Sequence, residues 1–116
     1  MVVLGFFALT LKTLELDETL SKNVIKRIDG FSKDVMATEA MLIGQLGKNQ
    51  NCQGAIDGQT ILEFALDVVY MVHELAGGRI VFLECEKKQK LIDFYTRNGF
   101  ITLQKSGKYL QMIRYL

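Results

Sequence analysis

Apolar residues along this chain form runs typical of strands, separated by segments in which they recur at helical spacing. The runs predict strands over residues 2–16, 40–47 and 79–85, and a closing pair of strands within 100–116 around a turn at Ser106. The run at 79–85 is short, apolar and bounded by glycine and by charges, which favours an interior strand of a parallel sheet. Strand, helix and strand follow one another between residues 40 and 85, so the pattern predicts a right-handed crossover and an α/β fold.

The first helix is predicted within residues 17–30. Asp17 and Ser21 are both candidates for its N-cap, and Gly30 is its expected end. A third, shorter helix within 87–100 is expected to end at Asn98 and Gly99.

The longest helix is predicted from about residue 58 to residue 76, with Asp57 as its cap and Gly77 at its end. Its apolar positions follow the 3.6-residue period and predict one face packed on the core. These positions are Ile61, Leu62, Ala65, Val68, Val69, Val72 and Leu75.

The first strand contains a change of phase. Leu9 and Leu11 share one face, whereas Leu14 and Leu16 share the other, so the alternation slips by one residue at 12–13. Such a slip indicates either a bulge in one long strand or the end of that strand, and the sequence leaves both open.

Composition limits the classes of function. The 116 residues are 49% hydrophobic, which is typical of a single domain with one core over residues 1–116. The chain has fourteen Lys and Arg and thirteen Asp and Glu, which leaves a net charge of +1. This charge is too small to attract nucleic acid or anionic membrane. The first apolar run is too short to span a bilayer and has no preceding basic residue, so a buried strand is expected and no membrane partner.

Cysteine and histidine usage points away from disulfides and metals. Cys52 and Cys85 are too few for a disulfide framework, and we interpret them as free thiols of a reduced, cytoplasmic protein. His73 is the only histidine, and without a Cys/His cluster no metal site is expected.

The segment QGAIDG, residues 53–58, lies between the second strand and the long helix. A helix N-terminus presents unpaired amides and the positive end of the helix dipole, so the amides from Gly54 to Thr60 could hold phosphate oxygens. Asp57 beside a phosphate is unfavourable unless its carboxylate turns away to cap the helix. A plain turn that begins a helix has the same pattern, so both interpretations stay open.

A second motif, FYTRNGF at residues 94–100, ends the third helix. The order of strand, Gln-Gly-x-x-x-Gly loop, long helix, buried strand and Phe-Tyr-x-x-x-Gly-Phe helix resembles the GNAT superfamily of N-acetyltransferases. The resemblance implies the acyl-CoA N-acyltransferase fold, a mixed sheet flanked by helices, with acetyl-CoA as cosubstrate. Ile56 departs from the family's loop, which has a glycine there.

The resemblance also implies roles for individual residues. Tyr95 would donate a proton to the departing thiolate of coenzyme A. Glu84, on the buried strand beside the expected cleft, is the first carboxylate to test as general base. The strand and loop positions that would contact the coenzyme are Leu46, Gly47, Lys48, Gln53, Gly54, Ala55, Ile56, Asp57, Gly58, Gln59 and Thr60.

The function predicted from this resemblance is direct transfer of an acetyl group from acetyl-CoA to an amine acceptor. The family's opening strand, two helices and second strand have no counterpart here, because the strand at 2–16 resembles the family's third. That truncation and Ile56 favour the alternative, a non-catalytic module of the same fold that binds coenzyme A or a protein.

The resemblance and the exposed edge of the first strand each suggest a further partner. The segments FFALTLK and LIGQLGKN resemble sequences from the toxin-like branch of the family, whose acceptors are charged transfer RNAs. The basic residues Lys22, Lys26 and Arg27 are compatible with transfer RNA, whereas the net charge of +1 does not favour it. An apolar first strand at a sheet edge would be exposed, so a homodimer is also predicted.

Overall fold

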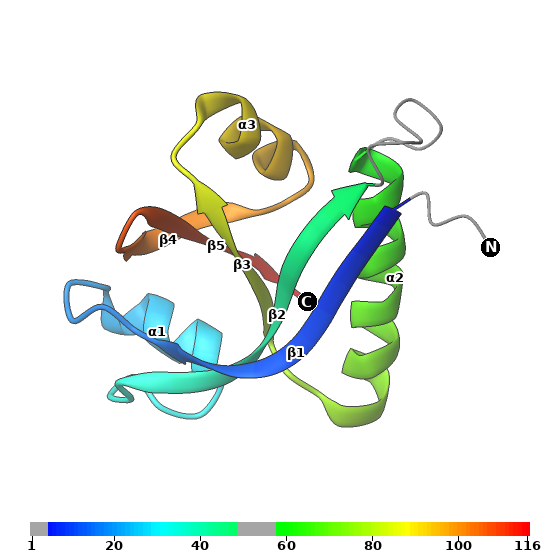
Figure 1. The fold of residues 1–116 in the computed structure, drawn as a ribbon. Helices are drawn as coiled ribbons and strands as arrows, with labels where there is room; N and C mark the ends of the chain where they lie inside the picture. Colours follow the sequence, from blue (N-terminus) through cyan, green and yellow to red (C-terminus); the bar gives the residue numbers. More distant parts are fainter. Residues whose placement is uncertain (1–4, 49–57) are drawn as a thin grey trace.

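The computed structural model describes residues 5–48 and 58–116, which form a mixed five-stranded sheet with three helices (Figure 1). The strand order is β1-β2-β3-β5-β4. β2 and β3 are parallel, as the crossover predicted, and the other neighbours are antiparallel. The elements are β1 (Gly5–Glu15), α1 (Lys22–Asp29), β2 (Ala37–Lys48), α2 (Gly58–Ala76), β3 (Ile80–Glu86), α3 (Gln89–Arg97), β4 (Ile101–Ser106) and β5 (Tyr109–Tyr115).

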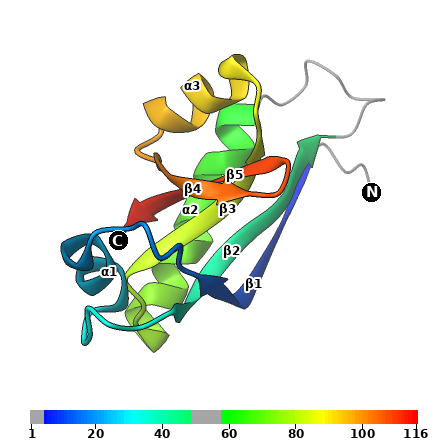
Figure 2. The same cartoon turned by 90° about the vertical axis from the view of Figure 1, so that its left-hand side faces the viewer.

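Helices α1 and α2 cover opposite faces of the sheet (Figures 1 and 2), and each face has its own core. Alternate residues of β3 enter opposite cores, because side chains of a strand point to opposite faces. Val81 packs in the α2 core and Phe82 in the α1 core. Helix α2 contributes Leu62, Ala65, Leu66 and Val69, and helix α1 contributes Ile25 and Ile28.

The phase change in β1 has a different cause from the two that the sequence suggested. The strand runs unbroken through residues 12–13 and pairs with β2 in one register from Ala8 to Glu15. Leu9 packs against the α2 core, whereas Leu14 and Leu16 lie in the α1 core. The buried face therefore switches along β1 because different helices cover its two ends. The register shift lies instead between Phe6 and Ala8.

The predicted ends of α1 are confirmed. Ser21 is its N-cap, and the Ser21 hydroxyl accepts a hydrogen bond from the Val24 amide at 3.2 Å. Gly30 ends the helix at φ 90°, where its amide donates to the Lys26 carbonyl at 2.7 Å. A residue without a side chain suits this left-handed conformation.

Helix α2 has the predicted bounds, but one predicted core position is wrong. Leu75 is 89% exposed, because the last turn of α2 turns this side chain away from the sheet. Val68 and Val72 are half-buried. The predicted cap Asp57 lies outside the described residues. No described helix is both long enough and apolar enough to cross a bilayer.

Candidate functional site

Strands β2 and β3 separate part-way along their length. They pair only at Met41 with Val81 and at Leu42 with Phe82. Beyond these pairs β2 continues beside β1 to Lys48, while β3 continues beside β5. The backbone of β2 beyond Leu42 therefore has one edge paired with β1 and another that faces the opening between the strands.

A shift in the pairing of β1 with β2 accompanies this separation. Phe6 pairs with Gly47 and Ala8 with Gly44, so β2 has one more residue than β1 between these pairs. An extra residue bends its strand and increases its twist. The irregularity thus lies in the part of β2 that diverges from β3.

A cavity of about 430 Å³ opens where the two strands separate. Strand β2 contributes Gly44 to its wall, and helix α3 contributes Tyr95. The structure therefore brings Tyr95 beside the diverging strands. The remaining lining residues are Leu42, Ile43, Leu83, Glu84, Cys85, Glu86, Leu91 and Tyr109.

Tyr95 is held by aromatic and backbone contacts. Its ring packs edge-on against Phe94, with centroids 5.1 Å apart, and against Phe100 at 5.9 Å. Its carbonyl accepts hydrogen bonds from the Asn98 and Phe100 amides at 3.0 and 3.1 Å. Burial raises the pKa of the Tyr95 phenol above its ordinary value, and the nearby Cys85 adds to the rise. The phenol therefore stays protonated at neutral pH and is available as a donor.

Cys85 borders the same cavity as a buried free thiol. Its Sγ donates to the Glu86 carbonyl at 3.2 Å. Burial raises the pKa of Cys85, with a smaller contribution from the Glu86 carboxylate. A thiol that stays protonated is a poor nucleophile, so this environment does not favour an acyl-cysteine route. Cys52 lies outside the described residues.

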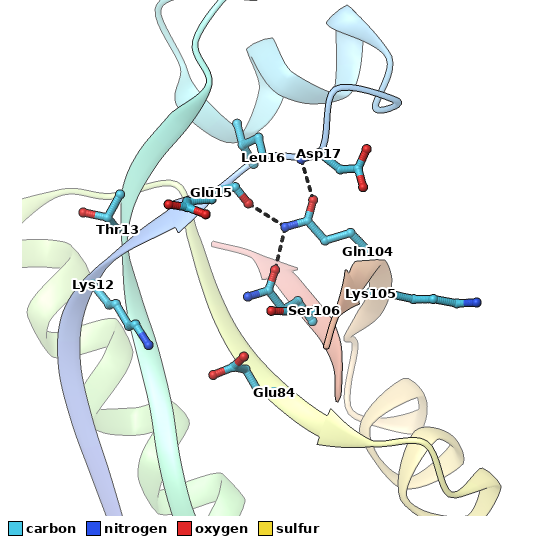
Figure 3. Close-up of a pocket in the computed structure, with 10 residues that line it drawn as sticks. Lys12, Thr13, Glu15, Leu16, Asp17, Glu84, Gln104, Lys105 and Ser106 are labelled. Carbon is cyan, nitrogen blue, oxygen red and sulfur yellow. Dashed lines mark hydrogen bonds between the residues drawn. The ribbon is translucent and has the colours of Figure 1, made fainter. Parts of the chain in front are cut away.

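A second cavity, of about 420 Å³, borders β1, β3 and the β4–β5 hairpin (Figure 3). Lys12 of β1 and Glu84 of β3 extend into the space between these strands. The other lining residues are Thr13, Glu15, Leu16, Asp17, Gln104, Lys105, Ser106 and Gln111.

Gln104 ties this hairpin to the end of β1. Its Nε2 donates to the Glu15 carbonyl at 2.6 Å and to Gln111 Oε1 at 2.5 Å, and its Oε1 accepts the Asp17 amide at 2.8 Å (Figure 3). A bulge makes this contact possible, because β4 has one extra residue, Leu103, between its pairs with β5. The role of Gln104 was not predicted from the sequence, since a single polar residue in a strand has no periodic signature.

Glu84 borders both cavities. It is exposed, and its Cα pairs with Gln111 of β5 across the antiparallel ladder. The first cavity holds Tyr95 and the second holds Lys12. Glu84 therefore lines both cavities beside the opening between β2 and β3.

The start of α2 lies beside the end of α3. A Cβ on Gly58 would lie 3.8 Å from the Phe94 ring. The side-chain amides of Gln59 and Asn98 exchange two hydrogen bonds, an interaction that the sequence did not indicate. Thr60 follows in the first turn, and Leu46, Gly47 and Lys48 belong to β2 beyond the separation.

The remaining predicted coenzyme contacts lie outside the described residues. These are Gln53, Gly54, Ala55, Ile56 and Asp57.

Several solved structures of bacterial toxins share this fold. A bacterial toxin aligns with a TM-score of 0.70 and 20% identity, over 97% of this chain and 59% of the toxin. AtaT complexed with acetyl-methionyl-tRNAfMet aligns with a TM-score of 0.69 and 24% identity, over 94% of this chain and 61% of AtaT. The chain has the acyl-CoA N-acyltransferase fold of the GNAT superfamily.

The GNAT fold predicted from the sequence is thus confirmed, including its similarity to the toxin-like branch. A KacTA–DNA complex also aligns, with a TM-score of 0.64 and 20% identity over 97% of this chain. The chain spans 58–61% of the length of these toxins. No protein-family model and no curated protein matches the chain.

Proposed function

We propose that this chain acts as an acetyl-CoA-dependent N-acetyltransferase. The observation that carries the proposal is the separation of β2 from β3 beside the cavity that holds Tyr95. AtaT, which shares the fold, has been solved in complex with its partner AtaR and acetyl-CoA. The opening between the strands presents an unpaired edge of β2 to this cavity, and an extended acyl arm needs such an edge for hydrogen bonds.

The coenzyme would lie along β2 and across the start of α2. The backbone of Leu46, Gly47 and Lys48 would bind the pantetheine arm. The diphosphate would lie against the amides of residues 53–60, which are those of Gln53, Gly54, Ala55, Ile56, Asp57, Gly58, Gln59 and Thr60. The amides of the first turn of α2 and its dipole favour an anion at this position.

The chemistry proposed is direct transfer. The acceptor nitrogen attacks the thioester carbonyl carbon, the carbon–sulfur bond breaks, and the thiolate takes a proton from the Tyr95 hydroxyl. Glu84 accepts the proton that the nitrogen loses. Its position at both cavities supports this role, since the acyl group would enter from one cavity and the amine from the other.

The acceptor proposed is an amine that approaches through the second cavity. Because AtaT has been captured with acetyl-methionyl-tRNAfMet, aminoacyl-tRNA is the first acceptor to test. Homodimerisation is proposed through β1, which is an edge strand of the sheet and exposes 72% of Leu11. Sedimentation that finds only monomer at micromolar concentration would exclude this dimer.

Calorimetry with acetyl-CoA and desulfo-CoA tests the proposal first. Binding of both is expected, and the absence of any binding would overturn the function. Acetylation is then measured with an amine panel that includes methionyl-tRNA. Tyr95→Phe is expected to keep coenzyme binding and to lose about 100-fold or more in transfer rate, the usual range for a lost general acid.

Two further variants assign the remaining groups. Glu84→Gln is expected to slow transfer, whereas Glu86→Gln is a control, because Glu86 is already paired with Lys88 at 3.2 Å. Cys85→Ala should retain transfer, and its loss would favour an acyl-cysteine. Coenzyme binding without transfer to any amine would instead support the non-catalytic module.

A further inference from the structure

Helix α2 carries apolar side chains on the side that faces away from the sheet. Phe64, Met71 and Leu75 are 57%, 62% and 89% exposed, and Val68 between them is half-buried. The spacing of four, three and four residues keeps all four side chains within roughly 60° of the helix circumference. These four residues are called the outer α2 stripe.

The fold does not account for this stripe. The opposite side of α2 already fills the core beneath it with Leu62, Ala65, Leu66 and Val69. A helix that is apolar on both sides is normally buried on both sides. Contiguous exposed apolar residues on a protein surface mark an interaction site. The outer α2 stripe therefore has the composition of a covered surface.

The charges beside the stripe are acidic. Helix α2 contains Glu63, Asp67 and Glu74 but neither lysine nor arginine. Helical geometry places all three carboxylates on the same flank, roughly 70° to 110° from the centre of the stripe. Arg114 approaches the same side of α2 through the Tyr70 hydroxyl at 3.4 Å, but it already donates to the Asn98 carbonyl at 2.7 Å.

We propose that the outer α2 stripe docks an amphipathic helix of a partner protein. The partner helix would carry apolar residues at alternating spacings of three and four, so that they interlock with the stripe. Lysine or arginine would line the edge of the partner that faces Glu63, Asp67 and Glu74. A second copy of α2 packed antiparallel would bring the two acidic flanks together, so charge favours a different, basic partner.

Three synthetic peptides of about 18 residues, long enough to match α2, test this surface. All are designed as helices: one has leucines at heptad spacing with flanking lysines, one has the same leucines with flanking glutamates, and one keeps the lysines but has serine for leucine. Fluorescence anisotropy of the labelled peptides measures binding to the full chain. The lysine–leucine peptide is expected to bind at least about tenfold more tightly than either other peptide.

Variants of the chain locate the binding and test the charges. Phe64→Ser combined with Leu75→Ser should abolish binding, whereas Phe31→Ser, at a side chain 95% exposed elsewhere, should not change it. Glu63→Lys, Asp67→Lys and Glu74→Lys together should reverse the preference toward the glutamate peptide. Circular dichroism confirms that each variant is folded, which is expected because these side chains lie outside the cores.

Several results would overturn the proposal. One is no binding of the lysine–leucine peptide by the folded chain, and another is equal binding of the lysine and glutamate peptides. A dimer of the wild-type chain that Phe64→Ser with Leu75→Ser converts to monomer would assign the stripe to a second copy instead. Nuclear magnetic resonance shifts confined to other elements would place the peptide elsewhere.

Discussion

Gln59 and Asn98 exchange two side-chain hydrogen bonds, from Gln59 Nε2 to Asn98 Oδ1 at 2.7 Å and from Asn98 Nδ2 to Gln59 Oε1 at 2.9 Å. Gln59 lies in the first turn of α2, and Asn98 follows the last turn of α3. Asn98 Nδ2 also donates to the Phe94 carbonyl at 2.8 Å. The pair therefore fixes the helix that carries Tyr95 relative to the start of α2.

Replacement of Asn98 by alanine is expected to destabilise the fold by about 1 to 2 kcal/mol, because partly buried acceptors and donors lose their partner. Urea unfolding of Asn98→Ala measures the loss. Gln59→Ala and the double variant complete a cycle, and the double variant should lose less than the sum of the two single losses. Additive losses would mean that the two amides do not interact in solution.

Removal of the Gln104 side chain is expected to free the hairpin from the end of β1. Gln104→Ala should lower the free energy of unfolding by about 1 to 2 kcal/mol, since it removes three hydrogen bonds, of which two are to backbone groups. Amide hydrogen exchange at Asp17 should accelerate, whereas exchange at Gly30, whose partner is Lys26, should not. Unchanged exchange at Asp17 would contradict this role.

Because Gly30 has no side chain, Arg79 can pack across the end of α1. A Cβ on Gly30 would lie 2.4 Å from Arg79 Cδ, and Arg79 Nε donates to the Arg27 carbonyl at 2.9 Å. Gly30→Ala is expected to cost about 1 to 3 kcal/mol, because a left-handed residue gains a side chain and Arg79 is displaced.

Gly77→Ala is the matched control, because Gly77 has φ 79° with open space around it. Gly77→Ala should therefore carry only the cost of backbone strain and lose less stability than Gly30→Ala. In an Arg79→Ala background the extra cost of Gly30→Ala should disappear. An equal cost in both backgrounds would show that the contact with Arg79 is unimportant.

Tyr95 should make the fold sensitive to alkaline pH. Because burial raises the pKa of the folded phenol, its contribution to stability is complete below the unfolded pKa of about 10 and is lost as pH rises through the folded pKa. As the pH rises above about 10, the free energy of unfolding of Tyr95→Phe should therefore fall less than that of the wild type. Ultraviolet titration of the phenols, folded and in guanidinium chloride, measures the shift, and identical curves would contradict it.

The elements that local pattern determines were predicted from the sequence. Helix α2 has the predicted ends, and Ser21 and Gly30 end α1 as predicted, because capping and helical periodicity depend on neighbours in the chain. The parallel pairing of β2 with β3 followed from the predicted strand–helix–strand crossover.

Features that depend on distant contacts were not predicted. The change of buried face in β1 arises from two helices on opposite sides, so Leu9 and Leu14 are explained only by the tertiary structure. The hydrogen bonds of Gln59 and Gln104 join elements far apart in the chain. Leu75 fitted the apolar period of α2 yet is exposed, because it lies with Phe64 and Met71 on the side of the helix that faces away from the sheet.

The short pairing between β2 and β3 has a mechanical consequence. One half of the sheet is β1 with β2 and the other is β3, β5 and β4, and backbone pairing joins these halves only at Met41 with Val81 and Leu42 with Phe82. Each half is an extensively bonded antiparallel unit, whereas the seam between them has little backbone pairing. The two halves are therefore held together chiefly by side chains: Met41 and Val81 pack in the same core, and Gln104 of β4 bonds to the backbone of Glu15 and Asp17.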